Sequence, residues 1–278
     1  MSEIAASGPS VLPSSGSPQR REVEFRGGGF MAVPQPLYSW VAFAGIIALW
    51  QVSISAGWID PVFLPSPASI CIALWQLVVS GDLWIHMSAS LSRIGTGWFI
   101  GTGLGLAIGV AMGLNSSARA VGMPLVSAIY PVPKIALLPL LILWLGIGET
   151  PKVVTIASGV FFPTIIATLA GVDAVPRNLI RMAQSFNMPT SGIIWKIMMP
   201  SALPGILSGF RISVSTALIL VVAAEMIGAQ YGIGAFLLTA GNLMQSDDLM
   251  AGVVILSILG LSIGAAITVF ERIFLRWR

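Results

Sequence analysis

Residues 177–200 read RNLIRMAQSFNMPTSGIIWKIMMP, a polar and basic stretch between two long apolar segments. The pattern predicts two short amphipathic helices, over about 176–186 and 190–199, separated by a break at Asn187-Met188-Pro189. A connection between two apolar segments needs only a few residues, so one this long, helical and basic is expected to be held by a partner. The alternative is a basic loop without a partner. The basic residues are Arg177, Arg181 and Lys196, and the apolar positions at helical spacing are Ile193, Ile194, Ile197 and Met198.

Composition defines the broad class of the protein. Apolar residues make up 56% of the 278 residues and charged residues 9%, so we expect an all-α integral membrane protein. A single cysteine, Cys71, excludes a disulfide framework and a cysteine-built metal site. One histidine, His86, and few carboxylates leave little for acid–base chemistry, so we expect no enzyme, no metal site and no cofactor bound by this chain. We interpret His86 as a hydrogen-bonded surface residue rather than a ligand.

Two regions of the chain differ in composition. Residues 1–36 are rich in Ser, Pro and Gly and are predicted to be a disordered cytoplasmic tail, and no apolar run follows its first basic residues closely enough for a signal peptide. Residues 37–278 are predicted to form the transmembrane domain, with about six spanning helices. The spans are expected at about 38–56, 94–114, 121–148, 153–171, 202–227 and 249–270.

Three further segments are helical without forming a complete span. An amphipathic helix is expected near residues 67–80, capped by Ser66 or Ser69, and another stretch runs from Asp82 into the second span. Residues 229–248 are too short and too rich in glycine to cross a bilayer, so they are expected to form a re-entrant segment or a surface helix.

The second span carries a glycine at every fourth position. This spacing predicts a ridge of small residues along one helix face, which allows a neighbouring helix to approach closely. A nucleotide-binding interpretation fails, because no strand precedes these glycines. The ridge consists of Gly97, Gly101, Gly105, Gly109 and Gly113.

Charged residues at membrane depth have two interpretations. Ionisable groups there are costly and usually face a cavity or a partner. Arg211, Lys134 and Tyr130 are therefore candidates for a translocation path for an anion. Alternatively, Arg211 extends to the cytoplasmic interface, and Lys134 lies at a helix break caused by Pro124, Pro131, Pro133 and Pro139. Glu149 and Glu225 are expected to organise the outer helix ends.

The distribution of basic residues predicts the orientation. With the amino terminus in the cytoplasm, six spans place the tail, Arg119, the 177–196 loop and the carboxy terminus on the same side. Ten of the 14 Lys and Arg residues then lie inside, and the other four lie in or at the edge of spans. Asp60, Asp82, Asp247 and Asp248 face out.

The 177–200 stretch resembles the EAA loop of the permeases of ABC importers. That loop has the pattern E-A-A, three residues, Gly, nine residues, I-x-L-P. Two positions depart from it, because Arg181 replaces Glu and Asn187 replaces Gly. Asparagine is the next-best residue for a left-handed turn, so the bend is expected to remain, whereas any salt bridge of the Glu is lost. Aligned on Pro200, the matching residues are Arg181, Met182, Ala183, Asn187, Ile197, Met199 and Pro200.

The resemblance covers roughly residue 63 to the end. Residues 131–149, 203–212 and 223–234 are similar to the sulfonate, taurine and nitrate branch of these permeases. It implies a type I ABC importer transmembrane fold, a homodimer in the bacterial inner membrane, two cytoplasmic ATPase subunits and an extracytoplasmic substrate-binding protein. It also implies docking of helices 176–199 on the ATPase. ATP and Mg²⁺ belong to that separate chain, because no Walker A motif occurs here.

Two other classes of membrane protein are alternatives to an importer permease. A secondary transporter or channel driven by an ion gradient often has internal repeats and carboxylates in mid-membrane, and neither is evident here. A membrane-embedded enzyme would need a nucleophile with a base, or a metal cluster, and the sequence has no such pair. A requirement for ATP and a second subunit would discriminate the importer from the secondary transporter.

Overall fold

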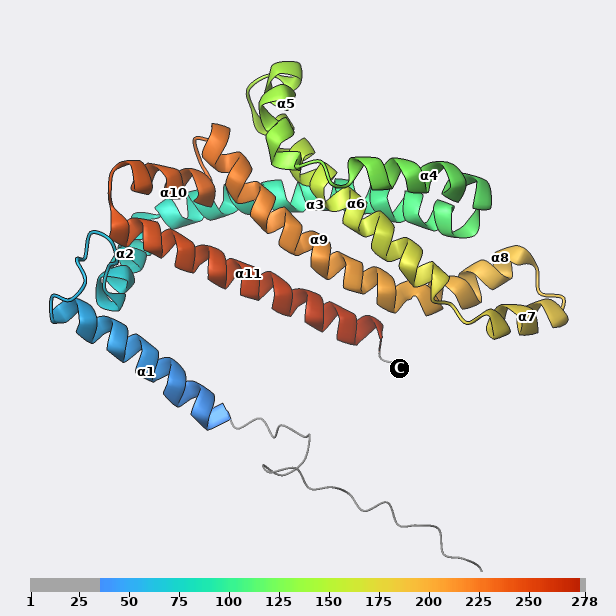
Figure 1. Ribbon diagram of the computed structural model, residues 1–278, viewed down its shortest axis with the longest axis horizontal. Coiled ribbons are helices and arrows are strands. Elements are labelled where there is room, and N and C mark those ends of the chain that lie inside the picture. The colour runs from blue at the N-terminus through green and yellow to red at the C-terminus, as the bar shows by residue number, and fades with distance from the viewer. Residues whose placement is uncertain (1–35, 276–278) are drawn as a thin grey trace, which may run out of the picture. The chain divides into compact units, whose positions relative to one another are not determined.

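The computed structural model describes residues 36–275, and every regular element in that range is a helix (Figure 1). The chain divides into two units, one ending at Ile46 and one beginning at Ile47. In the first unit the described part is the beginning of α1. The disordered tail expected over residues 1–36 lies almost entirely outside the described residues. The helices are α1 (Pro36–Ser55), α2 (Pro67–Ser80), α3 (Asp82–Leu114), α4 (Ser116–Ile129), η1 (Lys134–Leu137), α5 (Leu138–Leu145), α6 (Glu149–Asp173), α7 (Arg177–Ser185), α8 (Thr190–Ile193), η2 (Ile194–Met198), α9 (Met199–Gly228), α10 (Ile233–Asn242) and α11 (Ser246–Phe274).

The ends of α2 follow local sequence rules. Ser66 is its N-cap, and the Ser66 hydroxyl accepts a hydrogen bond from the backbone N–H of Ser69 at 3.0 Å, so the first of the two expected caps is the correct one. Pro67 occupies the first turn, where no N–H is required. Gly81, with φ of 87°, ends α2 and begins α3 in the left-handed conformation that glycine adopts without strain.

The predicted glycine ridge of α3 packs against α6. A Cβ placed on Gly105 would lie 2.7 Å from the carbonyl oxygen of Phe161 and 2.9 Å from the Thr164 Cβ, so only glycine permits this approach. Every ridge glycine meets a residue 59 positions further along the chain, which means that α3 and α6 run parallel and in register. The pairs are Gly97 with Ile156, Gly101 with Val160, Gly105 with Thr164, Gly109 with Thr168, and Gly113 with Val172.

The helix α9 packs against α6 in the opposite direction. A Cβ on Gly171 would lie 2.8 Å from the carbonyl oxygen of Ala202, and Gly209 lies against Ala167. Since the residue numbers rise along α9 as they fall along α6, the two helices are antiparallel. The three helices α3, α6 and α9 form the centre of the second unit, where α3 has its most extensive packing on α6 and α6 also packs on α9 (Figure 1).

Parallel α3 and α6 decide how many times the chain crosses the membrane. Five described helices are long and apolar enough to span, or six if the bent pair formed by α4 and by η1 with α5 is one span. Because two parallel spans need a return crossing between them, that pair, bent by 82°, supplies the return. The break between its halves contains Pro131 and Pro133, as expected. The other two prolines break nothing, since Pro124 lies inside α4 and Pro139 in the first turn of α5.

The expected boundary between the second loop helix and the fifth span is wrong. The sequence predicts a second loop helix over 190–199 that is separate from a span beginning near 202. Instead, α8, η2 and α9 form one helical run from Thr190 to Gly228. Pro200 reads as a helix end because it lacks an N–H, but the preceding turn, η2, is a π-helix whose wider winding leaves room for the proline. Residues 229–248 contain the short helix α10, in agreement with the prediction.

Candidate functional site

The loop between α6 and α9 turns on Asn187. This residue has φ of 53°, in the left-handed region. The N–H of Asn187 donates to the carbonyl of Gln184 at 2.9 Å, and the N–H of Met188 donates to the carbonyl of Ala183 at 3.1 Å. These two bonds form a Schellman motif with Asn187 at the position that usually holds glycine. The bend expected at Asn187 is therefore present, and α7 ends through it.

The loop presents a different apolar surface from the one expected. Ile193 is 7% exposed and packs within the chain, which is the alternative left open for the isoleucine face. The large apolar side chains exposed on the loop are instead Met182, Phe186 and Trp195, at 52%, 78% and 71%. Phe186 directly precedes the bend. We name Met182, Phe186 and Trp195 the loop apolar set. Helical periodicity does not single out Phe186 and Trp195, because Phe186 precedes the bend at Asn187 and Trp195 lies in the π-helix η2.

The other predicted residues of the loop range from exposed to buried. Arg177, Arg181 and Lys196 are exposed, and Ala183 is buried at 2% exposure beneath the bend. Ile194 and Ile197 are half-buried. The loop therefore combines three exposed cationic residues with three exposed apolar side chains on one short segment.

A charged network joins α3, α6 and α9 at the end of these helices that lies opposite the loop between α6 and α9. Arg93 of α3 donates through Nη1 to the Glu225 carboxylate of α9 at 2.7 Å, and through Nε and Nη2 to Glu149 of α6, with 2.9 Å for the second contact. The side chains of Arg93 and Glu225 are 6% and 0% exposed. Lys152 adds a contact of 3.2 Å to Glu149. Charges this deeply buried require partners, and here each has one.

The backbone before α10 completes the network. The Ser90 hydroxyl donates to Glu225 at 2.8 Å and accepts from the N–H of Ile233 at 2.9 Å. The N–H of Gly234 donates to the same carboxylate at 2.9 Å, and Arg93 donates to the carbonyl of Tyr231 at 2.6 Å. His86, through Nδ1, lies 3.0 Å from the carbonyl of Gly232. Glu149 and Glu225 thus organise helix ends, and His86 is hydrogen-bonded, as expected.

Two of the three translocation-path candidates, Lys134 and Arg211, have hydrogen-bond partners within the chain. Lys134 donates to the carbonyls of Ile129 and Val132 at 2.7 and 2.8 Å, beside the break before η1, and its Nζ lies 4.7 Å from the centre of the Phe162 ring. Arg211 pairs with Glu271 of α11 at 2.5 Å. Tyr130 lies in the break and is 48% exposed. The structure does not bring Lys134 and Tyr130 together with Arg211, so the role of these three residues in a path stays a prediction.

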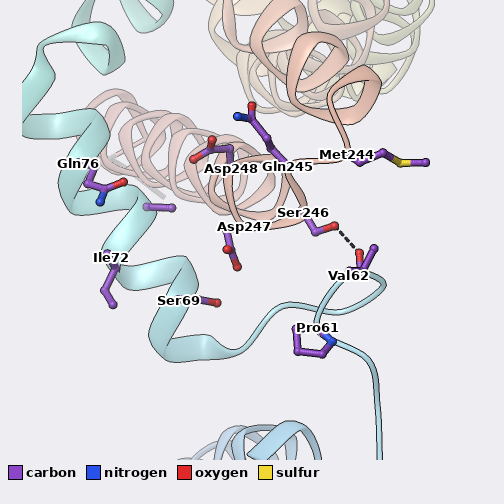
Figure 2. A pocket seen from close by; sticks show the side chains of 11 residues that line it. Pro61, Val62, Ser69, Ile72, Gln76, Met244, Gln245, Ser246, Asp247 and Asp248 are labelled. Atoms are coloured by element: carbon purple, nitrogen blue, oxygen red, sulfur yellow. Dashed lines mark hydrogen bonds between the residues drawn. The ribbon is translucent and has the colours of Figure 1, made fainter. Parts of the chain in front are cut away.

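A groove of about 500 Å³ lies between the loop after α1, the helix α2 and the turn before α11 (Figure 2). Met244, with φ of 57°, takes the left-handed position of a second Schellman-type turn. The Ser246 hydroxyl donates to the carbonyl of Val62 across the groove, and Asp247 and Asp248 stand in the first turn of α11, where the helix dipole favours carboxylates. The two aspartates are therefore explained by the helix alone.

The five or six candidate spans and the exposed loop between α6 and α9 define the broad class, a multi-pass helical membrane protein. Known proteins identify the family. The model of the binding-protein-dependent transport system inner membrane component matches residues 101–278, and this chain belongs to that family. It is therefore a multi-pass inner-membrane permease of an ABC importer, not an enzyme, and the family works with an ATPase and a substrate-binding protein.

Individual relatives cover most of the chain. The putative aliphatic sulfonates transport permease protein SsuC of Bacillus subtilis (strain 168) is 34% identical over 235 residues, which is 84% of this chain and 85% of that protein. The taurine transport system permease protein TauC of Escherichia coli (strain K12) is 34% identical over 239 residues, 84% of this chain and 87% of that protein. Among solved structures, an inward-facing MetNI methionine ABC transporter matches with a TM-score of 0.62 at 22% identity, covering 72% of this chain and 96% of that one. The last likeness supports the type I importer fold alone.

Proposed function

We propose that this chain imports a small aliphatic sulfonate, taurine among the candidates, delivered by a substrate-binding protein. One observation carries the proposal: the sulfonate and taurine permeases named above each match over 84% of the chain at 34% identity. Nitrate, the other substrate of the branch expected from the sequence, is kept as a test ligand.

We further propose that two copies of the chain form the pore, with both termini in the cytoplasm. The orientation rests on the ten of 14 basic residues that share one side. The same orientation places the ion pair of Arg119 with Asp173, at 2.7 Å, at the cytoplasmic ends of α3 and α6. It places the network of Arg93, Glu149 and Glu225 at the outer ends.

The loop of residues 176–199 is proposed to dock on the ATPase subunit. Exposed apolar side chains on a water-facing loop require a cover, and a short helix laid in a groove is a common arrangement. We assign the contact to the loop apolar set, with Arg177, Arg181 and Lys196 around it. Because α8 continues into α9 without a break, a displacement of the docked loop moves the span directly, which turns the path from one side to the other.

The test is reconstitution of the permease with its ATPase and binding protein in proteoliposomes. We expect ATP-dependent accumulation of radiolabelled taurine or ethanesulfonate, and little accumulation of methionine. The control is an ATPase variant that binds but does not hydrolyse ATP. Accumulation that persists with this variant and follows an imposed ion gradient would contradict the importer mechanism. Accumulation of nitrate in place of both sulfonates would contradict the proposed substrate class.

A further inference from the structure

A small cavity lies where α5, α6 and α9 meet, at the end of α6 that carries the charged network. Its volume is about 250 Å³, below the roughly 300–1,000 Å³ typical of pockets for drug-sized molecules, so it suits a small ligand. Apolar residues form most of its wall, among them Leu138, Ile142 and Ala224. Lys152 is the charged residue in the lining.

Lys152 is buried with unused bonding capacity. The residue is 5% exposed, and its ammonium makes one hydrogen bond, to Glu149 Oε1 at 3.2 Å. An ammonium carries three donors, so two of them have no acceptor within the described chain. A charge left in this condition at a buried position is unfavourable unless another acceptor comes to it.

Both neighbouring carboxylates have hydrogen bonds from groups other than Lys152, whose ammonium balances the second negative charge of the network. Glu149 accepts two hydrogen bonds from Arg93, through Nε and Nη2. Glu225 accepts from Ser90, from the N–H of Gly234 and from Nη1 of Arg93. Since two-point contacts with arginine are stronger than a single long contact with lysine, Lys152 is the most weakly held member of the network and the one free to bind an incoming group.

The backbone adds positive character on the same wall. Gly148 lines the cavity and is the N-cap of the 25-residue helix α6, and it offers no side chain to cap the helix. The dipole of a long helix favours negative charge at this end, where Glu149 in the first turn already supplies one carboxylate and Arg93 pairs with it. The cavity thus places a buried cation and a helix N-terminus on one side and aliphatic side chains on the other.

We propose that this cavity is an anion subsite of the permease, which binds the acidic head group of the cargo at Lys152 and its short aliphatic part against Ile142 and Ala224. The inference rests on the proposed function for the identity of the cargo, a small organic sulfonate. In the proposed orientation the subsite lies at the outer end of α6, on the side from which the binding protein delivers the anion. The charge is balanced within the network before the anion arrives, so the subsite holds the cargo weakly and can release it.

The direct test is binding of ethanesulfonate to the complete permease–ATPase complex in lipid nanodiscs without the binding protein. Equilibrium binding of the labelled anion is compared with binding of the uncharged ethanesulfonamide. We expect saturable ethanesulfonate binding, weakened at least about tenfold by Lys152→Gln because a hydrogen-bonded charge pair is lost, and retained within about threefold by Lys152→Arg. Ethanesulfonamide should bind poorly to all three.

A second pair of variants tests the cavity without altering the network. A Cβ on Gly228 would lie 3.7 Å from Ile142 Cδ1, an ordinary contact, so Gly228→Ala should bind ethanesulfonate like the wild type. Gly228→Leu should fill the cavity and abolish binding while the complex still assembles. This pair keeps the proposal testable if Lys152→Gln impairs folding.

The outcomes separate the subsite from the function. Absent ethanesulfonate binding in the wild type, or equal binding by wild type, Lys152→Gln and Gly228→Leu, overturns the subsite even if sulfonate uptake is normal. Binding that follows Lys152 and Gly228 as expected, in a complex that imports no sulfonate with its binding protein, supports the subsite and overturns the proposed substrate. A Lys152→Gln complex with lower thermal stability but unchanged anion binding assigns Lys152 a purely structural role.

Discussion

At the residue scale, Asn187 shows why a change in the family pattern is tolerated. The left-handed backbone at φ of 53° is the geometry for which glycine is usually chosen, and asparagine adopts it more readily than other residues with a side chain. We expect Asn187→Gly to keep full activity. Asn187→Val should uncouple ATP hydrolysis from uptake, because a β-branched residue resists positive φ at a cost of about 1–2 kcal/mol.

The measurement is ATPase activity and substrate uptake in reconstituted complexes, with pull-down of the ATPase subunit. Asn187→Gly serves as the matched control, since both variants remove the same amide. Full coupling and full ATPase binding by Asn187→Val would show that the bend does not transmit the motion.

Arg93 supports three helices through one side chain. Arg93→Met leaves Glu225 buried without its cation, and breaking a buried pair in this way costs about 3–5 kcal/mol. We expect a large fall in the thermal stability of the purified permease. The control is Arg119→Met, which removes an exposed ion pair with Asp173 and should change stability little. Equal stability of both variants would mean that the network is dispensable.

The ion pair of Arg211 agrees with the interpretation in which this residue extends to the cytoplasmic interface. Its contact with Glu271 of α11, at 2.5 Å, occupies the guanidinium at the edge of the second unit. We expect Arg211→Gln to leave the apparent KM and the maximal rate of sulfonate uptake unchanged, since a half-exposed pair contributes little. A raised KM with intact assembly and basal ATPase activity would return Arg211 to the translocation path.

The same residues show how far sequence reasoning reaches into the site. Glu149 and Glu225 were expected at outer helix ends, because their positions in apolar segments imply partners. The sequence places Arg93 only in or at the edge of a span, since nothing in the local sequence tells which side chain 56 to 132 residues away will pair with an arginine. Pairing over that distance depends on the packing of α3, α6 and α9, which no local pattern contains.

At the scale of elements, the glycine ridge makes a sharp prediction. Gly105→Leu would drive a side chain into the Phe161 carbonyl and Thr164, at a cost of roughly 1–3 kcal/mol for overpacking. Gly103 lies on the same helix with no atom within 4 Å of a Cβ, so Gly103→Leu is a control for helix propensity. We expect low yield and early unfolding for the first variant only. Similar yields for both would place the ridge against lipid.

Helix positions followed from the sequence better than helix ends. Apolar runs place all five of these spans, because the bilayer requires a minimum length of apolar helix, but two of the helices, Asp82–Leu114 and Thr190–Gly228, begin well before the expected spans at 94–114 and 202–227. The junction at Pro200 was missed, since proline permits either a stop or a widened turn and the choice depends on what packs around it. The bend of 82° at Pro131 and Pro133 was expected as a break, but its angle is a property of the packed helices.

At the scale of the whole molecule, the parallel arrangement of α3 and α6 requires the chain to cross the membrane between them. Cysteines introduced at Asn115 and at Ile147, which is 92% exposed, should therefore react on opposite sides, in a variant that lacks Cys71. We expect a membrane-impermeant maleimide added to intact cells to label the 147 variant only. A cysteine at Thr190 should label only after the membrane is opened. Labelling of both 115 and 147 from outside would reduce the chain to five spans.

The constant offset of 59 residues between the glycine ridge and its partners also has a consequence for biogenesis. During translation the ridge of α3 leaves the ribosome before any part of α6 has been made. At about 5–20 residues per second, roughly 3–12 s pass between the synthesis of each ridge glycine and the synthesis of its partner on α6. For that time the glycine face of α3 is not covered by α6, and α4, which packs on α3 in the folded protein, is the next segment to be made. Slowing translation between codons 115 and 170 should therefore increase degradation of the nascent permease by membrane proteases.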